Sequence, residues 1–407
     1  MVIDVYVVYA LLFMSLYFEV FLLIAVIQRY FWKPQRNVAT GALPSVAIVV
    51  PSYNEERGIA ATLRSLIALD YPKDKLEIIV VDDGSTDQTL AAAKQFASEP
   101  NVKIFSKENG GKHTAMNFAL ERTSADLIGC LDADSVVEQG ALRAIIPVFQ
   151  NPRVAATTPG IHTKEATNLL QKMQQVEYRL SVFNRFALAS IGSAFITPGP
   201  FSLFRSDVVK KLGGWRHAYS TEDMEMALRI QEAGFLIGNV PEAIVYTMTP
   251  ATFRGLFRQR VRWTYGWLRN AVDYRHMFGN RAYGNLGLLI LPSAIISIFA
   301  GIYFFIRIVY FATRWVLETI FRVNELGFYP HSSFELFYVN TSAIWFLICM
   351  SVGVILVLLW TGTIVGTHQK VLPRATPLFL FFYSFLVPLW LGTAVFRAVF
   401  RTGVRWR

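Results

Sequence analysis

Four long apolar runs stand out in the pattern of hydrophobic and polar positions along the chain. They cover Val5–Ile27, Leu286–Phe311, Phe337–Trp360 and Pro377–Phe396. Each run is long enough for a helix to cross a hydrocarbon core of about 30 Å, so the pattern predicts four transmembrane helices. A cleaved signal peptide is the alternative for the first run, but this run lacks the basic start and the small-residue cleavage site of such peptides.

The segment between the first two runs has a mixed composition, and strand patterns alternate with helix patterns along it. Short apolar runs predict strands at Val46–Val50, Glu77–Val81, Val102–Phe105 and Leu127–Leu131, and apolar residues at helical spacing predict helices at Ile59–Leu69 and Leu90–Phe96. Such an alternation indicates a parallel sheet that is covered on both faces. We expect one α/β domain with a mainly parallel sheet and its own core.

Polar clusters follow three of these predicted strands. They are Pro51-Ser52-Tyr53-Asn54, Asp82-Asp83-Gly84-Ser85 and Asp132-Ala133-Asp134. The carboxyl ends of parallel strands meet at one edge of the sheet, where open α/β sheets bind their ligands. The sequence contains no Gly-x-Gly-x-x-Gly or phosphate-loop motif, so a dinucleotide or ATP cradle has no support.

Asp132 and Asp134 stand one residue apart at a strand end. Their carboxylates suit a hard divalent cation such as Mg²⁺ or Mn²⁺, which would join one or both of them to a diphosphate. A solvated turn is the alternative, and the apolar strand directly before the triplet favours the metal.

The acids after the second predicted strand suggest a nucleobase contact. A carboxylate of Asp82 or Asp83 can accept a hydrogen bond from the imide N–H of uracil, while Tyr53 stacks on the ring. For Ser85 to Asp87 the alternative is a turn cluster and a helix N-cap.

Thr221-Glu222-Asp223 precedes a helix-like segment at Met224–Glu232. Helix capping by Thr221 is one explanation of this triplet. In the other, Asp223 is a general base that removes the proton of an acceptor hydroxyl, and a single displacement at the anomeric carbon then inverts its configuration.

A basic amphipathic helix is predicted from about Thr252 to Asn270. Its apolar stripe alternates with Arg254, Arg258, Arg260, Arg262 and Arg269. It is expected to lie on the inner membrane face, where arginines and an interfacial Trp263 are ordinary. Alternatively, guanidinium groups within Gln259–Trp263 neutralise a departing diphosphate and the indole stacks on a sugar. Lys112, in a glycine turn, is either a flexible surface lysine or a phosphate contact.

The net charge of +10 does not indicate nucleic acid, because much of the basic excess lies next to apolar runs, where anionic lipid is the expected partner. Cys130 and Cys349 lack metal-ligand spacing and are interpreted as buried, reduced residues. His113 and His162 are interpreted as structural or exposed.

Basic residues predict the orientation in the membrane. Arg29, Lys33 and Arg36 follow the first run, whereas only Asp4 precedes it, so the large domain is expected in the cytoplasm and the N-terminus outside. Three C-terminal spans would leave a group of arginines outside, against this rule, so one run is alternatively a hairpin or a non-spanning segment. These arginines are Arg397, Arg401, Arg405 and Arg407.

Six motifs occur in a fixed order: PSYNEE at 51–56, VVDDGSTD at 80–87, GGKHTAMN at 110–117, LDADS at 131–135, TED at 221–223 and QRVRW at 259–263. Together they resemble the family-2 inverting glycosyltransferases, and within that family the membrane-integrated synthases of cellulose, chitin, hyaluronan and poly-N-acetylglucosamine. The resemblance covers Val46 to Asn270. It implies a Rossmann-like nucleotide-sugar-binding fold of the GT-A type and a UDP-sugar donor.

The resemblance also implies roles for residues by position. The donor-binding residues are Tyr53, Glu55, Asp82, Asp83, Lys112 and Asp132; the metal ligands are Asp132 and Asp134; the catalytic residues are Asp223, as base, and Glu222; the acceptor and diphosphate contacts are Gln259, Arg260, Arg262 and Trp263. Ala194–Phe204 falls at the family's acceptor-binding loop. It lacks the cysteine-glycine-serine version of bacterial cellulose synthases, which argues against cellulose.

The expected organisation has five parts. They are a transmembrane helix at 1–30, a linker at 31–44, a cytoplasmic glycosyltransferase domain at 45–250, interfacial helices at 251–282 and a region of about three spans at 283–407. The expected function is polymerisation of a UDP-sugar, with UDP-N-acetylglucosamine favoured, into a β-linked polysaccharide at the plasma membrane, with passage of the product through the membrane.

Two other functions remain open from sequence. One is non-processive transfer of a single sugar to a lipid-linked or other small acceptor. The other is a transporter or channel, against which stand the absence of paired repeats and the few intramembrane charges. Glu19 and Arg307 are candidates for a polar path, with interhelical pairing or snorkelling as the alternative.

Overall fold

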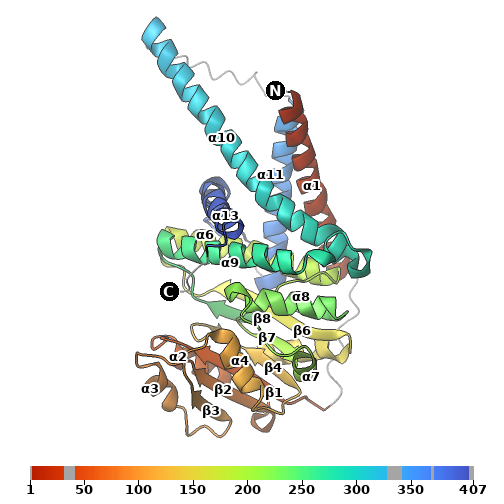
Figure 1. Cartoon of the computed structure of the whole chain (residues 1–407), viewed down its shortest axis with the longest axis vertical. Coiled ribbons are helices and arrows are strands. Elements are labelled where there is room, and N and C mark those ends of the chain that lie inside the picture. Colours follow the sequence, from red (N-terminus) through yellow and green to blue (C-terminus); the bar gives the residue numbers. More distant parts are fainter. Residues whose placement is uncertain (1, 32–41, 328–341, 368–370, 403–407) are drawn as a thin grey trace.

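The computed structural model describes residues 2–31, 42–327, 342–367 and 371–402. A sheet with its covering helices occupies the lower half of Figure 1, and long helices rise from it. Lys33, Arg36, Arg405 and Arg407, which entered the orientation argument, lie outside the described residues, as do residues 337–341 of the third apolar run.

The sheet has eight strands in the order β3-β2-β1-β4-β7-β6-β8-β5. Their bounds are β1 Val46–Ser52, β2 Leu76–Asp82, β3 Val102–Ser106, β4 Leu127–Cys130, β5 Val136–Val137, β6 Val154–Thr163, β7 Ser202–Arg205 and β8 Leu236–Thr247. β1 to β4 are parallel, β7 is antiparallel to β4 and β6, and β5 is antiparallel to β8. The predicted strands form the parallel half, and the mainly parallel α/β fold is confirmed.

Helices cover both faces of the sheet. They are α2 Ile59–Ile67, α3 Thr89–Lys94, α4 Lys112–Leu120, α5 Ala141–Ile145, α7 Ser206–Lys211 and α8 Glu222–Glu232. Successive β1 side chains point to opposite faces. Val46 and Ile48 pack with α2 and α5, whereas Ala47 and Val49 pack with α4, α7 and α8. This is why β1 is a continuous apolar run in the sequence.

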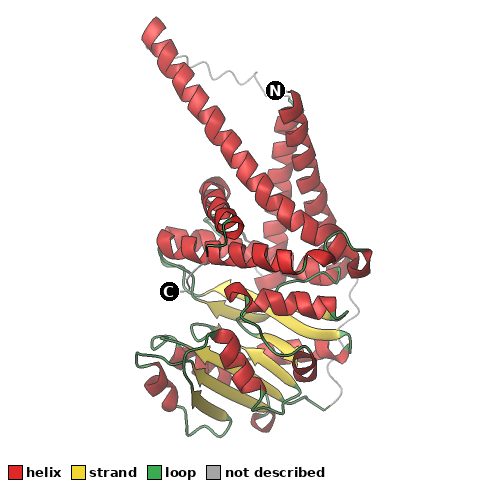
Figure 2. Ribbon diagram, viewed as in Figure 1, coloured by secondary structure: helices red, strands yellow, loops and turns green. Residues whose placement is uncertain are grey.

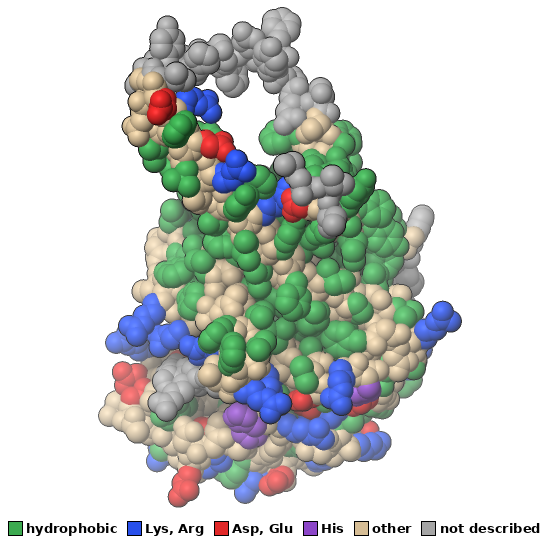
Figure 3. Space-filling view, turned by 45° about the horizontal axis from the view of Figure 1, so that its top comes forward, with side chains coloured by type: hydrophobic (Ala, Val, Ile, Leu, Met, Phe, Trp, Pro, Cys, Tyr) green, Lys and Arg blue, Asp and Glu red, His purple; other side chains and the backbone are tan. Residues whose placement is uncertain are grey.

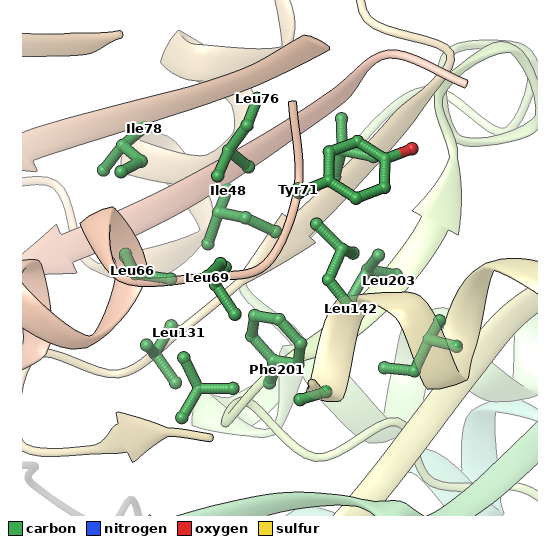
Figure 4. Close-up of a cluster of buried hydrophobic side chains, with 14 of the residues drawn as sticks. Ile48, Leu66, Leu69, Tyr71, Leu76, Ile78, Leu131, Leu142, Phe201 and Leu203 are labelled. Atoms are coloured by element: carbon green, nitrogen blue, oxygen red, sulfur yellow. The ribbon is translucent and has the colours of Figure 1, made fainter. Parts of the chain in front are cut away.

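The loop before β7 is anchored in the first of these cores. Phe201 is fully buried, and Figure 4 shows its ring among Leu69, Leu131 and Leu142. Its backbone N–H donates to the carbonyl of Cys130 at 2.6 Å. The segment predicted as an acceptor loop is therefore fixed at its C-terminal end.

Two long helices, α6 (Leu169–Ser190) and α9 (Phe253–Asp273), lie between the sheet and the apolar helices (Figure 2). A capping box starts α6, because Asn168 accepts the N–H of Gln171 while the Gln171 side chain accepts that of Asn168. Thr252 caps α9 by accepting the N–H of Gly255 at 3.2 Å. The amphipathic helix predicted at Thr252–Asn270 is thus present as α9. We call α6 and α9 the platform.

Within the described residues, four helical stretches have the length and apolarity to cross a membrane. They are Asp4–Arg29, Leu286–Glu325, Ala343–Thr367 and Thr376–Val399. The helices in these stretches are α1 Val2–Phe31, α10 Leu291–Leu326, α11 Ala343–Thr367, and α12 Thr376–Leu378 with α13 Ser384–Val399 in the fourth. Figure 3 shows apolar side chains over the surface of this part, with lysines and arginines gathered near its border with the sheet domain.

The fourth stretch differs from the others in direction. In Figure 1, α1 and α11 run lengthwise from the platform, whereas α13 is seen nearly end-on. Trp390 and Ala394 of α13 pack with Leu256, Val261 and Tyr265 of α9. Thr376–Val399 has the composition of a span, but α13 lies across the other apolar helices.

The two charged residues considered for a polar path both have side-chain partners. Arg307 of α10 forms an ion pair with Asp4 of α1, and Glu19 accepts a hydrogen bond from Ser15 at 3.1 Å. Arg307 therefore has the interhelical partner that the sequence analysis gave as the alternative to a polar path. Cys130 is buried as expected, but Cys349 on α11 is exposed, so its assignment as a buried residue is wrong.

Candidate active site

Asp83 organises the turn between β3 and α4. Its Oδ1 accepts hydrogen bonds from Nζ of Lys107 at 2.6 Å and from the N–H of Gly110 at 3.1 Å, and its Oδ2 accepts the N–H of Gly111 at 2.7 Å. Gly111 has a φ of 87°, a conformation that glycine adopts without strain. The second lone pair of Oδ2 leaves Asp83 able to accept one further donor.

The loops after β1 and β2 are hydrogen-bonded to each other beside Tyr53. Asp82 is buried, and it accepts from the hydroxyl of Ser106 at 3.0 Å and from the N–H of Ser85 at 3.3 Å. The Ser85 hydroxyl in turn accepts the N–H of Asn54 at 3.0 Å. Ser85 thus has the turn-forming role that was one of its two interpretations, and Tyr53 is half-buried on the same edge.

Lys112 is the first residue of α4, a helix that the sequence analysis did not predict. Its Nζ is ion-paired with Asp132, and its side chain is 22% exposed. A Cβ on Gly199 would lie 2.4 Å from Nζ of Lys112 and 2.8 Å from Oδ2 of Asp132, so a larger residue in the loop before β7 would displace these two side chains. The interpretation of Lys112 as a flexible surface lysine is wrong.

Asp134 is largely buried at the end of β4. Burial first, and then the negative charge of Asp132, raise the pKa of Asp134 to about 6, with a smaller contribution from Glu55. The hydroxyl of Ser135 donates to Oδ1 of Asp134 at 3.0 Å and opposes the shift. Three carboxylates therefore generate a negative potential beside Lys112.

The residues at this edge fit a divalent cation in part. Among the described residues, no group of three His, Cys, Asp or Glu side chains is arranged to hold a metal ion unaided. Asp132 and Asp134 supply hard oxygen ligands, and a cation would relieve their mutual repulsion. Oxygens of a bound diphosphate would have to complete the coordination.

Asp223 lies in the first turn of α8. Burial first, and then Glu222, raise its pKa to about 6, while Lys112 and Arg262 oppose the shift. The backbone carbonyl of Asp223 accepts the hydroxyl of Thr197 at 2.6 Å. Asp223, Glu222, Lys112, Thr197 and Gly199 line one small pocket. A carboxylate with a pKa near neutrality can serve as a general base.

A left-handed turn precedes Asp223. Ala218, Tyr219 and Ser220 have φ values of 42°, 57° and 62°, which is unusual for consecutive residues other than glycine. The carbonyl of Ser220 accepts Nη1 of Arg262 at 2.7 Å. Asp223, Glu222 and Asp132 all favour the charge of Arg262, whose pKa burial lowers. Arg262 therefore joins α9 to the acidic pocket.

Thr221 does not cap α8 with its side chain. Its hydroxyl donates to the carbonyl of Ala218 at 2.8 Å and accepts Nδ2 of Asn270 at 2.9 Å. A Cβ on Gly266 would come within 2.3 Å of the Thr221 side chain, so α9 approaches this turn very closely. The capping interpretation of Thr221 is wrong, and the residue instead connects the turn to α9.

The residues of α9 that were predicted to contact the acceptor or the diphosphate have different partners. Arg262 lies with the acidic pocket, whereas Arg260 is ion-paired with Glu177 of α6 at 2.6 Å. The guanidinium carbon of Arg260 lies 4.3 Å from the centre of the Trp263 ring. Gln259 has a buried Oε1 without a hydrogen-bond partner among the described residues. The guanidinium of Arg260 is thus paired with a protein carboxylate, and its role as a diphosphate contact stays a prediction.

Several residues of the site were missed by sequence reasoning. Lys107 and Glu177 are single charged residues without a motif, and Thr197 acts through the carbonyl of Asp223. Thr197 and Gly199 lie in the segment Ala194–Phe204, which was assigned as an acceptor loop, but the close approach of Gly199 to Lys112 and Asp132 was not predicted.

Comparison with known proteins identifies the class of protein. Residues 44–266, more than half of the 407-residue chain, match the family model described as glycosyltransferase like family 2. The chain belongs to this family and is a glycosyltransferase. The predicted family and enzyme class are confirmed.

Curated relatives narrow the comparison. The chain is 29% identical over 300 residues to a poly-β-1,6-N-acetyl-D-glucosamine synthase of Staphylococcus epidermidis, with 72% of each chain covered. It is 31% identical over 267 residues to the synthase of the same name from Staphylococcus aureus, covering 63% of this chain and 64% of that protein.

A solved structure supports the fold. The mannosyltransferase PcManGT of Pyrobaculum calidifontis, in complex with GDP-Man and Mn²⁺, superposes with a TM-score of 0.63 and covers 98% of this chain and 99% of its own. At 18% identity this likeness concerns the fold alone.

Proposed function

We propose that the chain polymerises UDP-N-acetylglucosamine into a β-linked polysaccharide at the cytoplasmic face of the cell membrane. The relatives support the sugar, since two of the matched proteins carry the name poly-β-1,6-N-acetyl-D-glucosamine synthase. The observation that carries the proposal is the arrangement around Asp223. The carboxylate of Asp223, whose pKa is raised, meets the positively charged side chains of Lys112 and Arg262 at one edge of the sheet, next to the platform that lies under the apolar helices.

The chemistry of this arrangement is an inverting displacement. The acceptor hydroxyl oxygen attacks the anomeric carbon, and its proton passes to the carboxylate of Asp223. The bond from the anomeric carbon to the diphosphate oxygen breaks, and the electron pair leaves with UDP. Arg262 and Lys112, whose positive charges both act on Asp223, stabilise the negative charge that develops on the leaving group.

The donor is bound at the ends of β1, β2 and β4. Tyr53 stacks on uracil, Asp83 accepts one further hydrogen bond, and Asp82 and Glu55 support the pocket. Mg²⁺ or Mn²⁺ on Asp134 and Asp132 would neutralise the diphosphate. Lys112 is ion-paired with Asp132, so its contact with the donor phosphates requires its Nζ to move from this carboxylate toward them.

The platform holds the acceptor side against lipid. Arg29, at the end of α1, indicates by the positive-inside tendency that the sheet domain is cytoplasmic. Trp263 is 37% exposed, as a sugar-stacking residue must be. The apolar helices above α9 keep the product at the membrane, and the polymer passes between them.

The packing of α13 on α9 supports a non-spanning C-terminal segment. This arrangement keeps Arg397 and Arg401 on the cytoplasmic side and removes the conflict with the positive-inside tendency. Arg401→Cys in a Cys349→Ser background can be labelled with a membrane-impermeant maleimide. We expect labelling in inside-out vesicles alone; labelling in right-side-out vesicles would make Thr376–Val399 a true span.

The decisive experiment incubates purified protein with single UDP-sugars, Mg²⁺ or Mn²⁺ and a short β-linked N-acetylglucosamine acceptor in excess. UDP release identifies the donor, and product size in the first few per cent of conversion identifies the mode of transfer. We expect long polymer beside unused acceptor from UDP-N-acetylglucosamine. Asp223→Asn is the inactive control.

Other outcomes select the alternatives. A ladder of short products would show a distributive polymerase, and a product that stops after one sugar would show single transfer to a small acceptor. If no UDP-sugar supported UDP release with either metal, the proposed activity would be wrong.

A further inference from the structure

A polar cluster of two buried side chains and one half-buried side chain joins three parts of the chain on the membrane side of the site. Glu177 comes from α6, Arg260 from α9 and Tyr383 from the π-helical turn Phe379–Tyr383 that precedes α13. Oε2 of Glu177 accepts Nη2 of Arg260 at 2.6 Å and the hydroxyl of Tyr383 at 2.7 Å. Arg260 is 83 residues from Glu177 in sequence, and Tyr383 is 206 residues away.

The burial of this cluster indicates a specific role. Arg260 is 5% exposed and Tyr383 is 2% exposed, whereas Phe381 and Phe382 in the same turn are 66% and 55% exposed. If apolar packing alone decided which side chains of this turn are buried against the protein, a phenylalanine would be buried as readily as the tyrosine. The π-helical turn instead directs the one hydroxyl of this turn inward, and such turns often mark functional positions.

Arg260 connects the cluster to the acceptor side. Its guanidinium carbon lies 4.3 Å from the centre of the Trp263 ring, within the range of a cation–π contact. Burying a guanidinium without an opposite charge is strongly unfavourable, so Glu177 is needed to keep Arg260 in this place. Two donors on one oxygen also restrict the Glu177 side chain. The orientation of the half-exposed indole therefore depends on Glu177 and, through it, on Tyr383.

We propose that Glu177 and Tyr383 are positioning residues for the acceptor: they hold Arg260 against Trp263, so that the segment before α13 completes the acceptor-binding surface. Neither residue lines the pocket around Asp223. Fixing the indole before the sugar arrives lowers the entropy cost of binding the acceptor. The proposal rests on the proposed function, because the acceptor is taken to be a growing chain that stacks on Trp263.

The test compares Tyr383→Phe and Glu177→Gln with the parent protein in detergent or nanodiscs. Both changes keep side-chain size and remove one member of the cluster. We expect the KM for a short β-linked N-acetylglucosamine acceptor to rise about tenfold in Glu177→Gln and about threefold in Tyr383→Phe. The UDP Kd by calorimetry should stay within about twofold in both, and early product should be shorter.

Tyr274→Phe is the matched control. Tyr274 also lies at α9 and donates its buried hydroxyl to a glutamate, Glu225, at 2.8 Å, but on the side of α8. If Tyr274→Phe raised the acceptor KM as much as Tyr383→Phe, general loosening of α9 would explain both and the inference would fail. It would also fail if Glu177→Gln and Tyr383→Phe kept the parental acceptor KM.

The failure of the inference can be told apart from that of the proposed function. A parent protein that forms no polymer, with any UDP-sugar, contradicts the proposed function. A parent that polymerises while both variants keep its acceptor KM and product length contradicts the inference alone.

A double variant tests whether Glu177 acts through Trp263. If it does, Trp263→Ala combined with Glu177→Gln should raise the acceptor KM no further than Trp263→Ala alone.

Discussion

The proposed donor side and the proposed acceptor side of the site are held together in different ways. On the donor side, the partners of Asp83 lie 24 to 28 residues away in sequence, within consecutive strand, turn and helix units. On the acceptor side, Glu177 binds partners 83 and 206 residues away. The donor side is thus a local property of the α/β domain, whereas the acceptor side requires the apolar helices to be in place.

This difference predicts how each side responds to change. A local hydrogen bond is formed whenever its strand and turn are folded, so donor binding should survive changes in the apolar helices. An acceptor surface assembled from α6, α9 and the turn before α13 should be sensitive to changes in the apolar helices. Asp223 lies between the two sides, because its turn is held by α9 and its pocket by the loop before β7.

The largest effect is expected from Asp223→Asn. The amide keeps the shape of the side chain but cannot take the acceptor proton, so we expect turnover to fall at least about a hundredfold. UDP-sugar binding, measured by calorimetry, should change little. Substantial remaining turnover would remove Asp223 from the base role.

On the donor side, Asp134→Ala should abolish the metal dependence of UDP binding. Without this carboxylate the cation loses a hard oxygen ligand, and we expect UDP affinity with Mg²⁺ or Mn²⁺ to fall by about tenfold or more. Calorimetry with and without metal measures the effect. Asp87→Ala, which changes an acid in a turn of the same edge, serves as the control and should keep the metal dependence. A parental metal response in Asp134→Ala would contradict the assignment.

Part of the fold and of the candidate site, including Asp223 and Asp134, could be predicted from the sequence. The parallel strands follow from continuous apolar runs and α9 from an apolar stripe with a period of about 3.6 residues, so the positions of these elements were predictable. Asp223 and Asp134 were found because each lies in a motif directly after a strand or before a helix.

Other features have no local pattern. The pairing of Arg260 with Glu177 depends on the way in which α6 and α9 pack, and charge alone predicted a phosphate contact for this arginine. The antiparallel β7 is four residues long and follows a loop rather than a periodic run. The crosswise direction of α13 cannot be seen in hydropathy, which is the same for a span and for an apolar helix that lies flat.

The pH dependence of activity should report on Asp223. Its pKa is raised to about 6, and the base is the deprotonated form, so activity is full above this pH and falls as the pH decreases through it. We expect kcat/KM at pH 5 to be about one tenth of its plateau value. Glu222→Gln removes the neighbouring negative charge and should move the acidic limb to lower pH. An unmoved limb in this variant would assign the titration to another group.

The smallest effect is expected from Ser220→Gly in the left-handed turn before Asp223. A residue with a side chain in this conformation costs about 1 kcal/mol, and glycine relieves that cost but makes the unfolded chain more flexible, so stability should change by less than about 1 kcal/mol. The variant keeps the carbonyl that accepts Arg262, but the turn is less restricted and Asp223 is less well placed. We expect turnover to fall about twofold to fivefold with unchanged UDP affinity.

Glu165→Gly is the matched control, since Glu165 has a φ of 40° and is exposed in the loop before α6. Equal turnover in Ser220→Gly and the parent would show that the turn is a strained connection without influence on the base. A loss in Ser220→Gly that Glu165→Gly does not share would show that α9 reaches the chemistry through the backbone of this turn as well as through Arg262.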